Sequence, residues 1–231
     1  MSSPQPRIGV LRFPGACDDR DAHWALAAFD AEAVFVWHTE TELPDLDAVV
    51  LPGGFSYGDY LRCGAIARFA PAMSAVAEFA ANGGLVLGIC NGFQILCEAG
   101  LLPGVLRRNE SLSFVCRDVP LVVERADTPF TNRCTEGERL TIPVKHGEGA
   151  WFADDDLYEE LVGRRQIVLR YAEPVNGSRA DVAGVVNERG NVMGLMPHPE
   201  HAVDPLLGSA DGAFILSSLV ESARKRTLAA F

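Results

Sequence analysis

Short apolar runs alternate with helix-patterned segments along the first ninety residues, and this alternation is the feature that most limits the fold. The runs IGVLRF, AVFVW, AVVLP and LVLGI are as long as strands and almost continuously apolar, like strands buried on both faces of a sheet. Between them, residues 18–31 and 65–82 carry apolar side chains at helical spacing, and Pro71 is expected near the start of the second helix or at a kink. This order predicts an α/β fold with a mostly parallel central sheet flanked by helices.

The second half of the chain is richer in strand patterns, namely SFVCR, PLVVE, LTIPV, QIVLRY, VAGVV and NVMGLMP. We expect several of these to add a smaller antiparallel portion beside the main sheet. A final helix near residues 210–225 has an apolar stripe and ends in basic residues, which a helix C-terminus favours. Because the sequence contains no internal repeat, low-complexity tract or long linker, we expect residues 1–231 to form a single domain.

The composition excludes some classes of partner. Among 231 residues, 20 are basic and 31 acidic, so the net charge is −11, which argues against a nucleic-acid partner. We find neither a secretory signal nor an apolar run near the roughly 20 residues that span a bilayer. We therefore expect a cytoplasmic protein without a membrane partner, whose six scattered cysteines are reduced thiols.

The segment GGLVLGICNGFQIL, residues 83–96, places a lone cysteine after an apolar run, with a glycine two residues away on either side. A nucleophile at the tip of a sharp strand-to-helix turn needs such glycines, because Gly88 and Gly92 relieve crowding there. The N-terminus of the following helix is expected to favour the thiolate of Cys90 over the thiol. The alternative is a buried cysteine beside glycines that serve packing alone, and packing is the role that we expect of Cys97.

A cysteine nucleophile requires a base, and two of the five histidines are candidates. His146 in PVKHGEG and His198 in MPHPE are each followed two residues later by a glutamate, which could reach the histidine from an extended backbone. Prolines stiffen the backbone around His198, whereas glycines loosen it around His146. Because catalytic positioning favours the stiffer segment, we prefer His198 with Glu200 and keep His146 as the alternative. His201 is expected to face the other way.

The loop LPGGFSYGDYLRCGA, residues 51–65, follows another predicted parallel strand and should border the same crevice. Its Gly-Gly pair could bring the backbone N–H of Gly54 close to a substrate oxygen. Together with the N–H of Asn91, this would form an oxyanion hole. A plain turn also explains two glycines after a strand, and that alternative stays open.

With these residues, the chain resembles the class I, triad-type glutamine amidotransferases and, more narrowly, the glutaminase subunits of phosphoribosylformylglycinamidine synthase. The class-wide likeness lies in G-x-C-x-G-x-Q at residues 88–94 and H-P-E at residues 198–200. The narrower likeness lies in segments that occur in the family's order over nearly the whole chain: GGFSYGDYLRCGAIA (53–67), RNESLSFVCR (108–117), IPVKHGEG (142–149), NGS (176–178) and MPHPE (196–200). Two details depart from it: EPVNGS, where an Asn before the Asn-Gly pair is usual, and His201, where an Arg is usual.

The resemblance implies a flavodoxin-like fold of the class I amidotransferase type and a Cys-His-Glu triad. Cys90 would be the nucleophile, His198 the base and Glu200 the group that orients the base, with no metal in the site. The α-amino and carboxylate groups of L-glutamine would lie in a pocket lined by Gln94, Lys145, His146, Gly147 and Glu148. On this interpretation His146 binds substrate instead of acting as the base.

The resemblance also implies partners. The sequence has no G-x-x-x-x-G-K-[ST] loop, so ATP chemistry must lie elsewhere. A large synthase subunit would bind ATP, Mg and formylglycinamide ribonucleotide, a small subunit would bridge the two, and this chain would hold no cofactor. Ammonia would pass to the synthase for ATP-dependent formation of formylglycinamidine ribonucleotide in de novo purine biosynthesis.

Two other interpretations compete with this one. The chain could supply ammonia to a different synthase, because the triad of every class I amidotransferase is the same. It could also be a redox-responsive or ligand-binding protein on a similar scaffold, although such a protein has no need of H-P-E.

Overall fold

The parallel part of the sheet carries the chain's first strands, as the sequence predicts. The structure is a computed structural model that describes residues 5–229. Its parallel strands are β1 (Arg7–Arg12), β2 (Glu32–Trp37), β3 (Ala48–Leu51), β4 (Leu85–Ile89) and β11 (Val192–Leu195). They lie in the order β2-β1-β3-β4-β11, with every neighbouring pair parallel. Every residue of β3, β4 and β11 is buried, which explains their continuous apolar runs.

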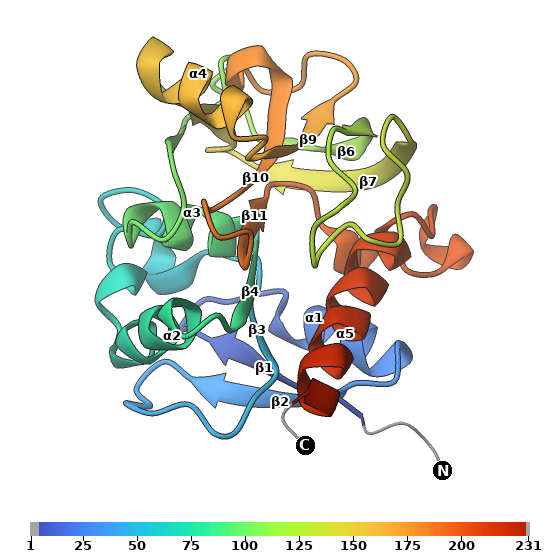
Figure 1. Cartoon of the computed structure of the whole chain (residues 1–231). Coiled ribbons are helices and arrows are strands. Elements are labelled where there is room, and N and C mark those ends of the chain that lie inside the picture. Colours follow the sequence, from blue (N-terminus) through green and yellow to red (C-terminus); the bar gives the residue numbers. More distant parts are fainter. Residues whose placement is uncertain (1–4, 230–231) are drawn as a thin grey trace.

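Four antiparallel strands extend the same sheet, and Figure 1 shows them above the parallel part. They are β6 (Val115–Val123), β7 (Arg139–His146), β9 (Ile167–Tyr171) and β10 (Val182–Val186). The full order is β2-β1-β3-β4-β11-β10-β9-β6-β7, so the expected α/β class with an antiparallel addition is confirmed. The runs SFVCR and PLVVE, which look like two strands in sequence, fall largely within the single strand β6. A separate two-stranded sheet pairs β5 (Val105–Arg107) with β8 (Ala150–Phe152).

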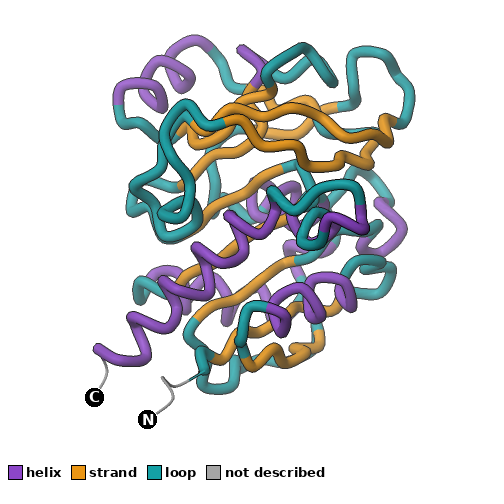
Figure 2. The backbone as a smooth tube through the Cα atoms, turned by 90° about the vertical axis from the view of Figure 1, so that its right-hand side faces the viewer, coloured by secondary structure: helices purple, strands orange, loops and turns teal. Residues whose placement is uncertain are grey.

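Helices cover both faces of the parallel strands. Figure 1 shows α2 (Pro71–Ala81) and α3 (Asn91–Glu98) on one face, with α1 (Asp19–Ala28) and α5 (Gly212–Ala229) on the other. In Figure 2, turned by 90°, α5 runs diagonally across its face of the sheet. A further helix, α4 (Asp155–Gly163), lies near the antiparallel strands. Among residues 5–229, we find no helix with both the length and the apolar character to cross a bilayer.

The helix predicted over residues 65–82 is shorter than expected. It begins at Pro71, and residues Ala67–Phe69 form a separate 3₁₀ turn. Proline lacks a backbone N–H and is tolerated in the first helical turn, where that group needs no partner within the helix. Pro71 therefore starts α2 and does not kink it.

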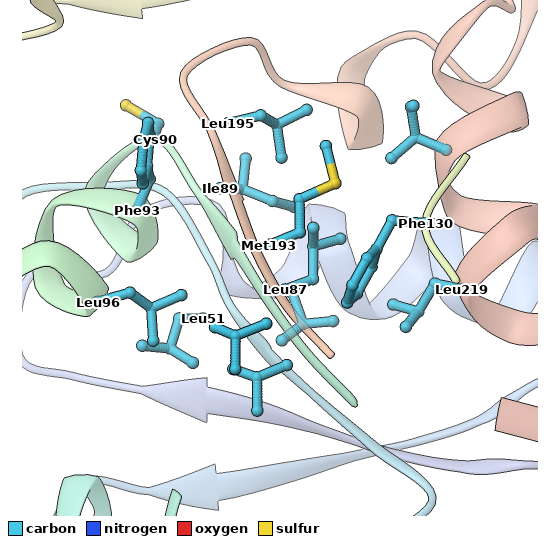
Figure 3. Packing of buried hydrophobic residues seen from close by; sticks show 14 of the residues in the cluster. Leu51, Leu87, Ile89, Cys90, Phe93, Leu96, Phe130, Met193, Leu195 and Leu219 are labelled. Carbon is cyan, nitrogen blue, oxygen red and sulfur yellow. The ribbon is translucent and has the colours of Figure 1, made fainter. Parts of the chain in front are cut away.

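The core lies between the buried strands and the helices on both faces. Figure 3 shows Leu87 and Ile89 of β4 beside Met193 and Leu195 of β11. Cys90 stands at the edge of this cluster, where β4 ends and α3 begins, and its sulfur points away from the packed side chains. The fold therefore delivers a thiol to the carboxyl end of the parallel strands, where ligand sites of open α/β sheets lie.

Candidate active site

The backbone at Cys90 is sharply bent between β4 and α3. Its φ of 49° and ψ of −103° lie in a region that residues with a side chain rarely adopt. A Cβ on Gly92 would lie 2.0 Å from the carbonyl oxygen of Leu51, and one on Gly88 would lie 2.7 Å from the backbone of Gly92. The two glycines are therefore required by the tight turn, as the sequence predicts.

The sequence-predicted histidine follows the strand beside β4. The backbone N–H of Cys90 donates a hydrogen bond of 2.8 Å to the carbonyl of Leu195, the last residue of β11. His198 comes three residues later, and its Nδ1 lies 2.6 Å from Oε1 of Glu200. The fold therefore gathers Cys90, His198 and Glu200 at the carboxyl ends of two adjacent parallel strands. Glu200 reaches its histidine across a 3₁₀ turn, Pro199–His201, and not along an extended segment.

Burial controls the charges of the His198–Glu200 pair. It lowers the pKa of His198 to about 3, although Asp18 opposes the shift, and it raises the pKa of Glu200 to about 8. Among the described residues, Nε2 of His198 has no hydrogen-bond partner. When Nδ1 shares its proton with Glu200, Nε2 is free to accept another proton, as a general base must.

The expected thiolate at Cys90 is not what the structure favours. Burial raises the pKa of the thiol well above its ordinary value, and the carboxylates of Asp18 and Glu200 raise it further. Lys145 and the backbone N–H of Asn91 act in the expected direction, but burial dominates. The resting site therefore holds a thiol, whose proton must leave when substrate reacts.

The two predicted oxyanion donors, the backbone N–H groups of Asn91 and Gly54, have different surroundings. The backbone N–H of Asn91 is close enough to the Cys90 thiol to lower its pKa, and the side-chain Oδ1 of Asn91 accepts from the backbone N–H of Ser56 at 3.1 Å. Gly54 has a φ of 139°, and a Cβ there would lie 2.5 Å from the backbone nitrogen of Cys17. Gly54 also borders a cavity of about 140 Å³ together with His198. The complete lining of that cavity is Cys17, Asp18, Gly54, Phe55, Phe114, Cys116, Lys145 and His198.

The predicted glutamine-binding residues are linked to each other and to the Cys90 turn. Nε2 of Gln94 donates to the carbonyl of Glu148 at 2.6 Å, and its Oε1 accepts from Nδ2 of Asn91 at 2.9 Å. The carbonyl of Lys145 lies 3.7 Å from Sγ of Cys90. The carbonyl of Gly147 accepts from the backbone N–H of Asn109 at 2.9 Å. These contacts bring the end of β7 against the start of α3.

His146, the alternative base, has different partners from His198. Its Nδ1 lies 3.0 Å from Oδ1 of Asn109, and its Nε2 lies 3.4 Å from Nδ2 of Asn176. Burial lowers its pKa to about 4, with a further contribution from His198. Neutral amides thus contact both ring nitrogens of His146. The glutamate two residues later, Glu148, has a different neighbour: the backbone N–H of Cys63 lies 3.4 Å from its carboxylate. The geometry favours His198 over His146 as the base.

Comparison with known proteins places the chain in a family. Residues 5–211 match the CobB/CobQ-like glutamine amidotransferase domain. Over 225 residues, the chain is 58% identical to the phosphoribosylformylglycinamidine synthase subunit PurQ of Salinibacter ruber, with 93% of this chain and 95% of that protein covered. The chain belongs to the PurQ family. It is a glutamine amidotransferase subunit of phosphoribosylformylglycinamidine synthase, an enzyme of purine biosynthesis, and the predicted family and activity are confirmed.

Solved structures agree with the PurQ fold. A chain in the structure of PurLQS from Thermotoga maritima is 46% identical, with a TM-score of 0.88 over 94% of this chain and 99% of that one. A glutamine amidotransferase from the same organism is 18% identical, with a TM-score of 0.59 over 97% of this chain and 99% of that one. The second likeness concerns the fold alone. Together they confirm the class I glutamine amidotransferase fold.

His201 does not face away from the site, as the sequence led us to expect. Its ring stacks on that of His198, with centroids 5.3 Å apart, and its Nε2 lies 3.8 Å from Oε1 of Glu200. The expectation assumed an extended backbone, in which neighbouring side chains alternate. The 3₁₀ turn at Pro199–His201 removes that alternation.

Sequence reasoning missed three buried polar residues of the site: Asp18, Asn109 and Asn176. The amides hold His146, and they lie within segments already quoted for the family resemblance, RNESLSFVCR and NGS. Asp18 follows β1, so its position near the carboxyl end of a parallel strand was an available signal. An aspartate directly before a helix, however, is equally typical of an N-cap residue without a role in a site.

One group of side chains could approach a metal ion together. Ligand atoms of Asp18, His198, Glu200 and His201 all lie within 4.8 Å of one another. Nζ of Lys145 already lies 2.5 Å from Oδ1 of Asp18. That ammonium supplies positive charge inside the cluster and opposes the entry of a second cation.

Proposed function

We propose that the chain hydrolyses L-glutamine through a triad in which Cys90 is the nucleophile, His198 the general base and Glu200 the group that orients the base. The observation that carries this proposal is the hydrogen bond between Cys90 N–H and the Leu195 carbonyl, because it joins the nucleophile turn to the strand leading to His198. The arrangement is completed by the His198–Glu200 contact of 2.6 Å and by Nε2 of His198, which has no hydrogen-bond partner in the described part of the chain.

Catalysis begins with proton transfer from the Cys90 thiol to His198. The thiolate attacks the side-chain amide carbon of glutamine, and the imidazolium returns the proton to the departing nitrogen. Ammonia leaves, and a γ-glutamyl thioester remains on Cys90. The same histidine then takes a proton from water, which attacks the thioester and releases glutamate. Glu200 stabilises the imidazolium at each proton transfer.

The backbone N–H groups of Asn91 and Gly54 serve as the oxyanion hole. The N–H of Asn91 is supported as a donor because it lowers the pKa of the Cys90 thiol, and that of Gly54 because its residue borders the cavity beside His198. Loss of one such donor costs about 2.7–4 kcal/mol in acyl-transfer enzymes. Water exclusion in the buried site strengthens both hydrogen bonds.

Glutamine's α-amino and carboxylate groups bind to the end of β7 and the first turn of α3. Support comes from the hydrogen bond between Gln94 and the Glu148 carbonyl, which joins the two segments. The carboxylate of Glu148 supplies a charge opposite to that of the α-amino group. The residues assigned to this pocket are Gln94, Lys145, His146, Gly147 and Glu148.

The whole chain, residues 1–231, acts as one cytoplasmic amidotransferase domain within a larger synthase. By analogy with the Thermotoga maritima PurLQS structure, it assembles with a PurL-type large subunit and a PurS-type small subunit. The large subunit binds ATP, Mg and formylglycinamide ribonucleotide, while this chain uses no cofactor. Ammonia passes directly to the synthase, since ammonia released into neutral water becomes mostly ammonium, a poor nucleophile.

The test is glutamate release by the chain alone and with the PurL-type and PurS-type subunits and their substrates. Cys90→Ser is expected to lower kcat at least 10³-fold, and assembly is expected to raise the activity of the unaltered chain. Cys97→Ser, seven residues further along the chain and inside α3, is the matched control and should retain kcat within about threefold. Retained activity in Cys90→Ser would refute the mechanism, and full activity of the isolated chain would refute the coupling to assembly.

A further inference from the structure

Asp18 occupies the N-cap position of α1 but does not cap the helix. Its side chain makes no hydrogen bond to the first turn. Asp154, at the same position of α4, does cap, because its Oδ1 accepts from the backbone N–H of Leu157 at 2.9 Å. The Asp18 side chain is also buried, with an exposed fraction of only 4%. A buried carboxylate that does not cap its helix requires another partner.

The partners of Asp18 are side chains around the His198 ring. Its Oδ1 lies 2.5 Å from Nζ of Lys145 and 3.7 Å from Nε2 of His201. Its Oδ2 lies 3.6 Å from Nδ1 of His198, on the side of the ring that also faces Glu200. Two carboxyl groups therefore face Nδ1 of the imidazole, whereas its Nε2 has no hydrogen-bond partner among residues 5–229.

A glycine makes this approach possible. A Cβ on Gly53 would lie 2.4 Å from Oδ2 of Asp18 and 2.6 Å from Cε1 of His198. The carbonyl of Gly53 also accepts the backbone N–H of Asp18 at 3.3 Å. Any side chain at position 53 would push the carboxylate and the ring apart.

The chemistry explains what a second carboxylate contributes. Burial disfavours a charged imidazole, and Asp18 is the largest of the neighbouring charges that oppose this effect. The mechanism nevertheless requires an imidazolium each time His198 takes a proton. A carboxylate within about 4 Å stabilises that cation strongly in a buried site. Lys145 contacts the same carboxylate and acts in the opposite direction, because its positive charge lowers the pKa of His198.

We propose that Asp18, held by Lys145, is a positioning residue that acts through His198, as a second carboxylate that orients the ring and stabilises its protonated form. This inference rests on the proposed function, because it assigns to His198 the role of the base. It predicts that Asp18 affects the chemical step and not the binding of glutamine.

The experiment measures kcat and KM for glutamine in the assembled synthase carrying Asp18→Asn. We expect kcat to fall at least tenfold and KM to stay within twofold of its original value. Asp18→Glu, which keeps the charge, should recover part of the lost kcat. Asp154→Asn is the matched control, since it makes the same change at the exposed N-cap of α4, and it should leave kcat unchanged.

Each outcome decides the question. If kcat of Asp18→Asn falls less than tenfold, or if a rise in KM accounts for the lost activity, the inference is wrong. If Asp18→Asn does not fold, Asp18→Ser replaces it, because serine is a good helix cap without charge, and the same limits apply. The parallel Cys90→Ser measurement separates the two proposals: activity retained there overturns the triad itself, whereas an inactive Cys90→Ser with a fully active Asp18→Asn overturns only the role of Asp18.

Discussion

The ends of β7 and β11 each present a buried histidine followed two residues later by a glutamate, yet the fold uses the two pairs differently. At His198, the glutamate turns back and contacts Nδ1 at 2.6 Å. At His146, the amides of Asn109 and Asn176 contact the ring. Burial lowers the pKa of both rings, to about 3 and about 4, so burial alone does not distinguish them.

The partner of a buried histidine, and not the stiffness of the flanking backbone, determines what the ring can do. The glycines beside His146 were expected to loosen it. Gly149 is instead needed for packing, because a Cβ there would lie 2.3 Å from Cε1 of the ring. Gly53 is needed in the same way beside His198, because a Cβ there would lie 2.6 Å from Cε1 of that ring. Carboxylates can stabilise an imidazolium, whereas neutral amides hold a neutral ring in place.

The largest difference between the two pairs is expected when each glutamate is replaced by glutamine. Glu200→Gln should lower kcat by about 10²–10⁴-fold, because an amide can hold the wrong tautomer and does not stabilise the imidazolium. Glu148→Gln should mainly raise KM, because its carboxylate is assigned to substrate binding. Steady-state glutaminase kinetics of the assembled synthase measure both. Equal effects of the two variants on kcat would contradict the distinction between the pairs.

A smaller effect is expected at the histidine with amide partners. His146→Asn should lower the free energy of unfolding by about 1–3 kcal/mol, because Asn109 and Asn176 lose a buried partner. Its kcat should fall less than tenfold, since we assign the reacting proton to His198. Urea denaturation and glutaminase kinetics measure the two quantities. A 10³-fold loss of kcat with unchanged stability would make His146 the better candidate for the base.

The smallest effect concerns pH. A histidine whose pKa is about 4 when folded and 6.5 when unfolded contributes stability above pH 6.5 that is lost as the pH falls towards 4. For His146, this amounts to about 2 kcal/mol between pH 6.5 and pH 5. The raised pKa of Glu200 has the opposite sign, since its contribution is present at low pH and lost as the pH rises through about 8. The contribution of Glu200 to the pH dependence of stability therefore offsets the contribution of His198, its hydrogen-bond partner.

The measurement is the free energy of unfolding at several pH values in the original chain and in His146→Asn. The difference between the two curves isolates the contribution of His146 and should shrink by about 2 kcal/mol as the pH falls from 6.5 to 5. A difference that does not depend on pH would show that the ring is protonated alike in both states.

The order of elements and the nucleophile turn could be predicted because they leave local patterns. Buried parallel strands read as apolar runs, as β3 and β4 do. The glycines on either side of Cys90 indicate a turn in which two positions have no room for a side chain. The likeness of these motifs to a family then gave the activity, which the family comparisons confirm. The roles of the individual triad residues stay predictions.

Other features left no local pattern. The charge state of Cys90 depends on burial by the whole fold, and the helix terminus that favours a thiolate is the weaker effect. The stacking of His201 on His198 depends on a 3₁₀ turn that a two-residue periodicity does not describe. Asp18 looks like a helix cap in sequence, because only the fold shows Lys145 and His198 beside its carboxylate.

Strand burial and turn geometry are properties of neighbouring residues, so the residue types at the ends of the strands can be predicted from the order of amino acids. Which of those residues meet depends on the folded chain, since hydrogen bonds and charge interactions act across distances in space, whatever the separation along the chain. Asp18 and Lys145 are 127 residues apart in sequence, and their side chains lie 2.5 Å apart.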